Sequence, residues 1–547
     1  MRDLMQHWEM RVSHILDHAA KYHPNRPIIS RSVEGPIEET NWAGIRAGAL
    51  RTAQAIHAHG LKRGDAIGVM AWNTARHLKV WYGVSGAGCV LHTLNPRLSA
   101  EQLIYIVNHA EDKMLMVDPD LAPLIAAVAP KLETVKDYVI LTDRANMPDI
   151  DLPGAICFED WIGAVDGDFT WVTGDERDAC GICYTSGTTG NPKGVVYTHR
   201  SNVLHALAAS SPDILNLTSR DRVMPVVPLF HANGWSIAYT APLNGASMAM
   251  PGRLMTPDAI YEMLEKGVTI TAAVPTIWLG LLQYLKDTGS KFSTLERVVI
   301  GGSSCPRAVI EAFQNIYGVQ VFHAWGMTET SPLGTTSSFK PEVAALSDEE
   351  KIDVQTTVGH PPFTVDLRIT DDEGKELDWD GETQGKLWIR GPGVVKRYLK
   401  KDEDATADDE WFDTGDVATM DANAYVRITD RSKDVIKSGG EWISSIDMEN
   451  AAVAHPGVAE AAAIGVPHPK WDERPILVVV KAPGADPDPA EIVDLASEGL
   501  AKWQRPDDVV FLDELPHTAT GKISKLNLRK ELEAMGYTLP EFRKESA

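Results

Sequence analysis

The sequence predicts an α/β protein in which helices cover parallel sheets over most of the chain, with a smaller α+β domain at the C-terminus. Three observations lead to this prediction. Apolar runs of strand length alternate with amphipathic segments of helix length. The pattern changes near residue 360, where short strands surround Asp- and Gly-rich turns. Residues 434–547 then carry a strand–helix pattern of their own, and a chain of 547 residues is too long for one ordinary core.

The elements follow in order along the chain. The first 24 residues carry Asp3, Glu9 and Asp17 among apolar residues, which favours an amphipathic surface helix over a signal peptide. A helix over 52–60, ended by Gly60, should lead into a strand over 65–73. Further strands are predicted over 113–118, 137–143, 269–275, 297–302 and 320–326. Helices over 276–287 and 306–318 should separate the last three strands. This alternation predicts parallel sheets.

The section over 365–395 contains two apolar strands around Asp/Gly-rich turns, which predicts a small antiparallel or barrel-like section. Beyond it, residues 448–458 and 489–503 have helical patterns, and residues 460–466, 475–484 and 508–516 have strand patterns. These segments are sufficient for a small separate α+β domain. We place the boundary between the two domains at residues 430–434.

The charge of the chain argues against two classes of partner. It has 52 Lys and Arg against 76 Asp and Glu, a formal net charge of −24. Nucleic acids and anionic membranes both require a basic surface, so neither is expected as a general partner. No run of 18 or more apolar residues occurs, so no membrane insertion is expected either. An anionic small molecule remains compatible with a locally positive pocket.

The cysteines point to a reducing compartment. Five are present, an odd and small number that fits the cytoplasm. Cys180 and Cys183 form a CxxC pair without a second pair or a histidine cluster nearby. We therefore interpret them as two small residues on a buried strand, with a metal or redox site as the alternative.

The stretch YTSGTTGNPKG at 184–194 predicts a phosphate-binding loop. A Walker loop requires GxxxxGK[ST], and Pro192 before Lys193 breaks that pattern. The composition still suits an anion, because glycines turn backbone N–H groups toward it while hydroxyls and a lysine add donors and charge. The residues concerned are Thr185, Ser186, Gly187, Thr188, Thr189, Gly190 and Lys193. The alternative is a surface turn rich in small polar residues.

This loop resembles the phosphate loop of the adenylate-forming enzymes, which include acyl- and aryl-CoA synthetases, firefly luciferase and the adenylation domains of peptide synthetases. Six further stretches match motifs of that family in the same order: PLFHANGW (228–235), GGSSCP (301–306), HAWGMTETSP (323–332), WFDTGDVA (411–418), DRSKDVIKSGGEWIS (430–444) and PHTATGKISK (516–525). The resemblance covers essentially the whole chain.

The resemblance implies a fold and a domain division. The fold is a large N-terminal domain of two parallel-sheet subdomains plus a small β-barrel, with a small mobile α+β C-terminal domain. The N-terminal adenylation domain spans 1–430, a hinge at 431–433 contains Lys433, and the C-terminal domain spans 434–547. The C-terminal domain is expected to rotate about the hinge between two half-reactions.

The resemblance also implies the chemistry. A carboxylate is a poor electrophile, so it is first transferred to AMP, and CoA then displaces AMP. ATP, CoA and Mg²⁺ are therefore expected. The loop from Thr185 to Lys193 would hold the β- and γ-phosphates. Thr185 and Glu329 would bind Mg²⁺, a cation that prefers oxygen ligands; Glu329 could otherwise be an ordinary carboxylate at a helix start.

The nucleoside would be held farther along the chain. Asp416 would accept hydrogen bonds from the ribose hydroxyls, with a turn-forming aspartate as the alternative. Arg431 would reinforce the ribose or phosphate contact, or else form a surface salt bridge. Trp325 is expected either to stack on the ligand or to pack in the core. The remaining nucleotide contacts implied by the resemblance are Gly302, Ser303, Ser304, His323, Ala324, Gly326, Met327, Thr328 and Ile428.

Lys522 is the strongest single candidate for catalysis. In this family the matching lysine enters the site and bridges the carboxylate and α-phosphate oxygens, a role that suits a charge on a long stem. After rotation, another face would border the CoA thiol. The residues implied there are Lys437, Gly439, Gly440, Glu441 and Trp442, with a simple tight turn as the alternative for the two glycines.

The acyl pocket is expected around His231 and Trp235, with Gly301, Met327 and Cys305 as further lining. His231 would orient the carboxylate or gate the pocket, or would be a buried histidine with one ordinary hydrogen bond. The chain resembles medium-chain fatty-acyl-CoA ligases and 3-methylmercaptopropionyl-CoA ligases. It is expected to act as a stand-alone ligase on 3-methylmercaptopropionate or short- to medium-chain fatty acids.

Several alternatives stay open at this point. Within the enzymes they are an aryl-CoA ligase, a fatty-acyl-AMP ligase and a luciferase-like oxygenase. From a different class, a non-catalytic acyl- or nucleotide-binding regulator remains, although the presence of Lys522 and Glu329 argues against it. Relatives often form homodimers, so a homodimer is also open.

Overall fold

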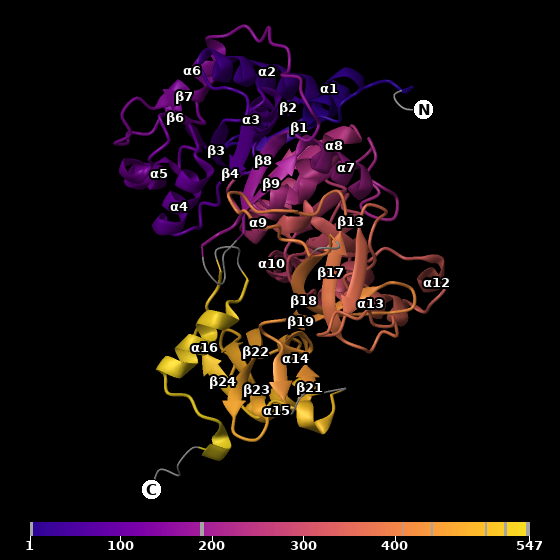
Figure 1. The fold of residues 1–547 in the computed structure, drawn as a ribbon. Helices are drawn as coiled ribbons and strands as arrows, with labels where there is room; N and C mark the ends of the chain where they lie inside the picture. Colours follow the sequence, from indigo (N-terminus) through magenta and orange to yellow (C-terminus); the bar gives the residue numbers. More distant parts are fainter. Residues whose placement is uncertain are drawn as a thin grey trace.

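The computed structural model describes residues 4–185, 191–407, 410–438, 441–497, 500–518 and 522–542. Figure 1 shows a large N-terminal part, coloured indigo to orange, and a small C-terminal part in light orange and yellow beneath it. No helix in the described part of the chain is long and apolar enough to span a membrane.

An eight-stranded sheet forms one half of the large part and carries the strands that lead into the site. Its six central strands are parallel, and the strand at each edge pairs antiparallel. In sheet order the strands are β15 (Leu333–Thr336), β14 (Gln320–Gly326), β13 (Arg297–Gly301), β12 (Ile270–Ala273), β10 (Arg222–Pro225), β11 (Ser247–Met250), β1 (Pro27–Arg31) and β2 (Ile37–Asn41).

A seven-stranded sheet forms the other half. It is parallel except at one edge, where β8 and β9 form an antiparallel pair. In sheet order the strands are β7 (Ile156–Cys157), β6 (Asp137–Ile140), β5 (Met114–Val117), β3 (Ala66–Met70), β4 (Val90–Thr93), β8 (Ala179–Tyr184) and β9 (Gly194–Thr198). The two parallel-sheet subdomains expected from the sequence are therefore present.

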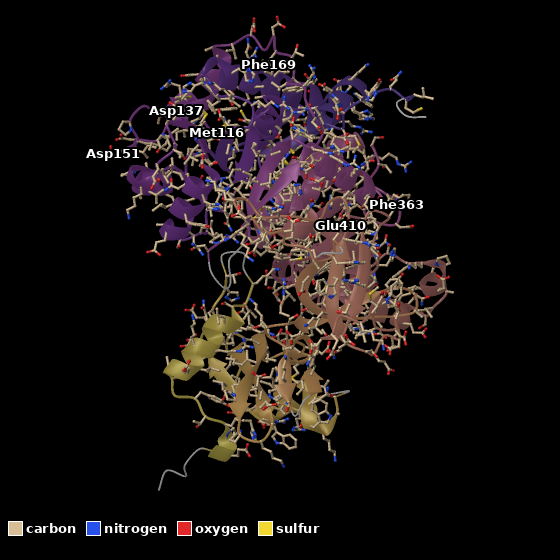
Figure 2. All side chains as sticks on the ribbon, viewed as in Figure 1. Met116, Asp137, Asp151, Phe169, Phe363 and Glu410 are labelled. Carbon is tan, nitrogen blue, oxygen red and sulfur yellow. The ribbon has the colours of Figure 1, made fainter. Side chains whose placement is uncertain are left out.

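Helices cover these sheets, and side chains fill the space between the layers (Figure 2). Met116 on β5 is fully buried, whereas Phe363 in a loop is fully exposed. The helices of the large part are α1 (Val12–Tyr22), α2 (Trp42–Ala58), α3 (Ala75–Gly86), α4 (Ala100–Ala110), α5 (Ala122–Val128), α6 (Phe158–Gly163), α7 (His199–Ala209), α8 (Ile237–Leu243), α9 (Pro257–Leu264), α10 (Pro275–Thr288), α11 (Arg307–Glu311), α12 (Pro341–Ala344) and α13 (Asp348–Thr356).

Local sequence signals explain where several of these helices begin and end. Asn41 accepts a hydrogen bond from the Gly44 N–H at the start of α2, and Ser99 with Gln102 forms a capping box on α4. Gly289 ends α10 in the left-handed conformation, with φ of 69°. The helix predicted over 306–318 is α11 followed by a π-helical turn over Ala312–Ile316.

The section after residue 360 is antiparallel, as predicted. It consists of β16 (Asp366–Thr370), β17 (Gly385–Arg390), β18 (Phe412–Met420) and β19 (Val426–Arg431), paired in that order. In the described residues, the section expected as a small barrel is a four-stranded antiparallel sheet, and Val426 on β19 also forms a bridge with Gly359. The antiparallel pairing of β18 with β19 places Asp416 and Arg431 opposite each other.

The C-terminal part has its own sheet and core, as the sequence predicted. The strands are β20 (Ile436–Ser438), β21 (Glu441–Ile443), β22 (Val458–His468), β23 (Asp472–Lys481) and β24 (Val509–Leu512), and the helices are α14 (Ser445–Val453), α15 (Pro489–Ala496) and α16 (Lys525–Ala534). The sheet is mostly antiparallel, with β24 parallel to β23.

Cys180 and Cys183 both lie on β8 and are buried as free thiols. They belong to different core clusters, because residues three apart on a strand point to opposite faces. Burial raises the pKa of the Cys180 thiol to about 12. The pair therefore fits the interpretation of small residues on a buried strand. In the described ranges, no group of three or more His, Cys, Asp and Glu residues is placed to hold a metal ion.

Candidate active site

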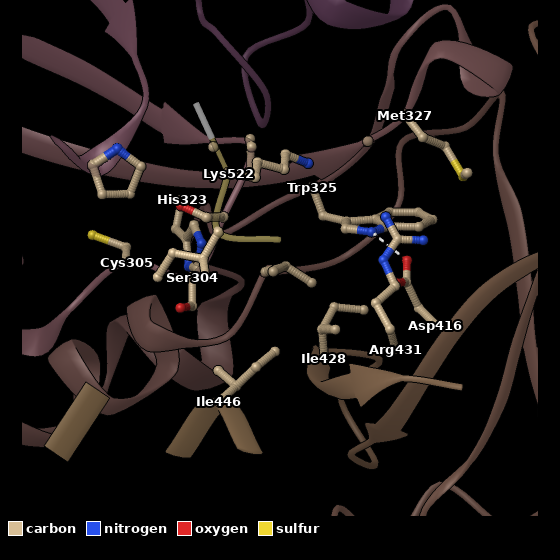
Figure 3. A pocket seen from close by; sticks show the side chains of 18 of the residues that line it. Ser304, Cys305, His323, Trp325, Met327, Asp416, Ile428, Arg431, Ile446 and Lys522 are labelled. Carbon is tan, nitrogen blue, oxygen red and sulfur yellow. Dashed lines mark hydrogen bonds and ion pairs between the residues drawn. The ribbon is translucent and has the colours of Figure 1, made fainter. Parts of the chain in front are cut away.

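A cavity of about 1570 Å³ lies between the large part and the C-terminal part. Its walls come from the ends of β8, β13 and β14, from β18 and β19, and from α14 and the segment before α16. Figure 3 shows Asp416 and Arg431 on one side of this cavity, and Ser304, Cys305 and His323 on the other. Parallel sheets place the carboxyl ends of neighbouring strands at one edge, which is why β13 and β14 deliver their residues to one place.

The predicted phosphate loop connects β8 to β9, and its two ends are fixed to each other. The Thr185 N–H donates to the Lys193 carbonyl at 3.0 Å, and the Lys193 N–H donates to Thr185 Oγ1 at 3.2 Å. Both residues line the cavity. The five residues between Thr185 and Asn191 fall outside the described residues: Ser186, Gly187, Thr188, Thr189 and Gly190.

Asp416, the residue expected to hold the ribose, is a buried carboxylate with two protein donors. Asp416 on β18 is 2% exposed. The indole Nε1–H of Trp325 donates to Asp416 Oδ2 at 3.0 Å, and Nε of Arg431 lies 2.9 Å from Asp416 Oδ1 (Figure 3). Burial raises the pKa of the Asp416 carboxyl, and the guanidinium of Arg431 opposes that rise. Each carboxylate oxygen has a further lone pair, so the group can still accept from a vicinal diol.

Trp325 packs against the core cluster of the four-stranded sheet, which is one of the two expectations for it. Its indole N–H also donates to Asp416, a contact that the sequence did not predict. The two residues are 91 positions apart, and no local pattern connects them.

The predicted adenine wall follows β13. Gly301 and Gly302 lie in a tight corner, where a Cβ on Gly301 would stand 2.8 Å from the Ala324 carbonyl oxygen and Gly302 has φ of 86°. Ser304 Oγ donates to Asn450 Oδ1 on α14 at 3.2 Å, which joins this wall to the C-terminal part. The rest of the predicted nucleotide contacts also line the cavity: Ser303, His323, Ala324, Gly326, Met327, Thr328 and Ile428.

Glu329 lies in a 3₁₀ turn, Thr328–Thr330, and is 8% exposed. The hydroxyl of Tyr398 donates to Glu329 Oε1 at 2.9 Å. A carboxylate and a hydroxyl on the same cavity, Glu329 and Thr185, are oxygen donors of the kind that Mg²⁺ prefers beside substrate phosphates. The donor set therefore fits this cation. Tyr398 was missed by the sequence analysis, because it belongs to none of the motifs that pointed to the site.

Lys522 reaches the cavity from the C-terminal part. Two hydrogen bonds join Lys522 to Thr518. The Thr518 N–H donates to the Lys522 carbonyl at 2.7 Å, and the Lys522 N–H donates to Thr518 Oγ1 at 3.2 Å. The residue is exposed to the open cavity, while protein surrounds its ammonium group. Burial lowers the pKa of Lys522 to about 8; Arg431 lowers it further, whereas Asp416 and Glu329 raise it. The lysine is thus close enough to Arg431, Asp416 and Glu329 to interact with their charges.

The acyl side contains His231 and Trp235. Trp235 covers Gly301, because a Cβ on Gly301 would stand 3.1 Å from its Cη2 atom. Residues 232–236 all have positive φ, from 43° to 62°, a conformation that is costly for residues other than glycine and is typical of functional sites. Burial, followed by the charges of Lys522 and Arg97, lowers the pKa of His231 to about 4, so its imidazole is neutral at ordinary pH.

The cavity lining also includes apolar side chains of the eight-stranded sheet, of the end of α7 and of the segment after it. These are Ala209, Leu215, Leu217, Val223, Ile270 and Val299. Cys305 also lines the cavity and is buried. Met327 lies beyond Trp325, on the opposite side of the view from Cys305 (Figure 3).

Two of the predicted CoA residues, Lys437 and Trp442, do not line the cavity. Lys437 and Trp442 face each other across the β20–β21 hairpin, with the Lys437 Nζ 5.7 Å from the ring centre, and neither is among the described residues that line the cavity. Gly439 and Gly440 fall outside the described residues, as does the side chain of Glu441. Lys433, the predicted hinge residue, follows β19 and lines the cavity.

Comparison with known proteins places these features in context. The model of the AMP-binding enzyme family matches residues 16–399, and the model of the AMP-binding enzyme C-terminal domain matches residues 447–522. The chain is 48% identical over 521 residues to the 3-methylmercaptopropionyl-CoA ligase of Ruegeria lacuscaerulensis, covering 95% of this chain and 97% of that one. It is 44% identical over 524 residues to the medium-chain-fatty-acid–CoA ligase of Ectopseudomonas oleovorans, covering 96% of each.

Solved structures agree with the fold. ATP-bound MatB from Rhodopseudomonas palustris has a TM-score of 0.80 and 27% identity, over 96% of this chain and 100% of that one. An anthranilate CoA ligase in complex with anthranoyl-AMP has a TM-score of 0.85 over 98% of this chain and 100% of that one; its identity of 24% supports the fold alone.

Proposed function

Because this chain belongs to the AMP-binding enzyme family, we propose that it is an ATP-dependent acyl-CoA ligase that joins a carboxylic acid to CoA through an acyl-adenylate. The observation that carries the proposal is the convergence of Lys522, Asp416 and Glu329 on one cavity, although they come from three separate segments. Binding alone would not require a lysine whose charge interacts with two carboxylates across a cavity between two parts of the chain.

In the first step the acid attacks the α-phosphorus of ATP and pyrophosphate leaves. Both reactants are anions, so catalysis depends on alignment and on neutralising charge in the transition state. Asp416 fixes the ribose, the loop from Thr185 to Lys193 holds the leaving phosphates, and Lys522 neutralises oxygens at the reacting centre. His231 is neutral and therefore adds no charge beside the incoming carboxylate.

Thr185 and Glu329 would hold Mg²⁺, which would neutralise charge on the phosphates. In the second step the CoA thiol attacks the acyl carbonyl and AMP leaves. We assign the region 431–433 as the hinge on which the C-terminal part turns between the steps, since Lys437 and Trp442 lie away from the cavity while Lys522 occupies it.

We further propose 3-methylmercaptopropionate and short- to medium-chain fatty acids as the acids. Two relatives with these substrates in their names support this proposal. The apolar residues in the cavity lining, such as Leu217, Ile270 and Val299, also support it, because they suit an alkyl chain.

The proposal is tested by acid-dependent exchange of pyrophosphate with ATP over a panel of straight-chain acids, 3-methylmercaptopropionate and benzoates, followed by addition of CoA. We expect exchange with 3-methylmercaptopropionate and the shorter fatty acids, and thioester formation once CoA is present. Absence of exchange with every acid would overturn the adenylation step. Exchange without thioester would identify an adenylate-only enzyme, and preference for benzoates would identify an aryl-CoA ligase.

Activity should fall at alkaline pH because Lys522 must be protonated. With its pKa lowered to about 8 in the free enzyme, the ammonium is charged below pH 8 and is lost above it. We therefore expect kcat/KM for ATP to fall about tenfold per pH unit above that point, while kcat holds to higher pH because bound phosphates raise the pKa. Lys522→Arg provides the control, since a guanidinium stays charged. An unchanged alkaline decline in that variant would assign the titration to another group.

Trp235 should limit the length of the acid. In Trp235→Ala the space beside Gly301 opens, so we expect the ratio of kcat/KM for decanoate to that for 3-methylmercaptopropionate to rise about tenfold. The matched control is Trp379→Ala in the exposed loop between β16 and β17, which should leave the ratio unchanged. An unchanged ratio in Trp235→Ala would mean that other residues set the depth of the pocket.

A further inference from the structure

The segment 393–399, which follows β17, connects two parts of the site that are far apart in sequence. The Val395 N–H donates to the Glu329 carbonyl at 2.7 Å, and the Leu399 N–H donates to the Gly194 carbonyl at 2.8 Å. The first bond fixes the segment to the 3₁₀ turn, and the second fixes it to the strand that leaves the phosphate loop. Ser331 adds a third bond, from its hydroxyl to the Gly393 carbonyl at 2.7 Å.

Tyr398 lies in this segment between Val395 and Leu399, and it contacts the side chains of both Glu329 and Lys193. Its hydroxyl donates to Glu329 Oε1 at 2.9 Å. The Nζ of Lys193 lies 4.8 Å from the centre of its ring, within the range of a cation–π interaction. Burial and the neighbouring Glu329 raise the pKa of the Tyr398 phenol, so it remains a donor at working pH.

We propose that Tyr398 is a positioning residue for the metal and phosphate side of the site. Its hydroxyl holds the Glu329 carboxylate in the orientation that receives a divalent cation, and its ring holds the Lys193 ammonium beside the phosphate loop. The proposal rests on the proposed function, because it takes Glu329 and Lys193 as the groups that bind metal–ATP.

The physical reason is that Mg²⁺ requires near-octahedral geometry and tolerates little error in the direction of a carboxylate. A glutamate has three rotatable bonds, and a hydrogen bond to one oxygen selects the rotamer that presents the other. The backbone bonds of Val395 and Leu399 make the phenol itself a fixed reference point. Tyr197 reinforces the same arrangement, since its hydroxyl donates to the Thr328 carbonyl at 2.8 Å.

Two substitutions separate the two contacts. Tyr398→Phe removes the hydroxyl and keeps the ring, so the orientation of Glu329 should be lost while the contact with Lys193 is kept. Tyr398→Leu removes both contacts. The matched control is Tyr425→Phe, because Tyr425 also has a hydrogen-bonded hydroxyl and a lysine, Lys340, over its ring, at 5.7 Å, but does not line the cavity in the described part of the chain.

Two measurements on the full-length protein test the proposal. The first is Mn²⁺ binding, followed by water proton relaxation, in the presence of a non-hydrolysable ATP analogue. The second is the Mg²⁺ concentration that gives half-maximal acid-dependent pyrophosphate exchange. In Tyr398→Phe we expect Mn²⁺ affinity to fall about tenfold and the required Mg²⁺ to rise about as much, with metal-free binding of the analogue unchanged. Tyr398→Leu should in addition weaken metal-free binding about threefold. Tyr425→Phe should match the wild type.

The outcomes separate this proposal from the proposed function. Wild-type exchange together with unchanged Mn²⁺ affinity in Tyr398→Phe would overturn the role of Tyr398 and leave the ligase intact. Mn²⁺ binding that depends on Tyr398, without exchange for any acid, would retain the positioning role and overturn the ligase. A wild type that binds no Mn²⁺ with the analogue overturns the positioning role. Thermal melting of each variant distinguishes loss of metal affinity from loss of the fold.

Discussion

Replacement of Lys522 by alanine is expected to reduce acyl-adenylate formation by about 10²–10³-fold, the usual effect of removing one preorganised charge or donor from a transition state. The lysine lies near Arg431, Asp416 and Glu329 in a cavity where burial already lowers its pKa to about 8. A cation placed there neutralises negative charge that develops at the reacting centre. The measurement is acid-dependent pyrophosphate exchange at saturating ATP.

A second measurement separates the two half-reactions. When chemically prepared acyl-adenylate is supplied with CoA, Lys522→Ala should still form thioester at close to the wild-type rate, since the lysine acts only on the first step. Lys530→Ala is the control, because Lys530 is exposed on α16 a short distance along the same segment. Equal loss of both half-reactions in Lys522→Ala would point to a structural role of this lysine.

Replacement of Asp416 by alanine is expected to raise the KM for ATP about 10²-fold, because the ribose loses charge-assisted hydrogen bonds worth on the order of 3 kcal/mol. The substitution also leaves the Trp325 N–H without its acceptor and Arg431 without its ion-pair partner. Asp416→Asn keeps an acceptor but loses the charge, so a smaller rise of about tenfold is expected. Nucleotide binding is measured directly by calorimetry alongside the kinetics.

The control for Asp416 is Asp366→Ala on the same four-stranded sheet. Asp366 is exposed and pairs with Arg390, so its loss should change neither the KM nor the melting temperature appreciably. If Asp416→Ala bound ATP as tightly as the wild type while melting at a lower temperature, Asp416 would be a structural residue and the assignment to the ribose would be wrong.

Much of the fold follows from patterns that repeat along the chain. Strand-length apolar runs such as residues 113–118 and 297–302 became β5 and β13, and the helix over 276–287 became α10. These elements are predictable because burial on both faces of a parallel sheet demands continuous apolar runs. The section over 365–395 was harder to predict, because short strands between turns do not reveal whether the sheet closes on itself.

For the candidate site, the sequence predicted individual residues but not the contacts between them. Motifs identified Lys522, Asp416 and Glu329, and the structure places all three on one cavity. Roles that depend on a distant partner were not predictable: Trp325 donates to Asp416 across 91 positions, and Tyr398 donates to Glu329 across 69. The CoA residues Lys437 and Trp442 remain predictions, since they lie away from the cavity.

By itself, the sequence determined the alternation of strands and helices, the family, and the candidate site residues, because each depends on residue types at short spacing. Only the tertiary structure decided which of those residues meet, how Asp416 is oriented, and that Tyr398 stands between Lys193 and Glu329. The physical reason is range: periodicity and turn chemistry act over a few residues, whereas a hydrogen bond between distant side chains exists only after packing has brought their strands together.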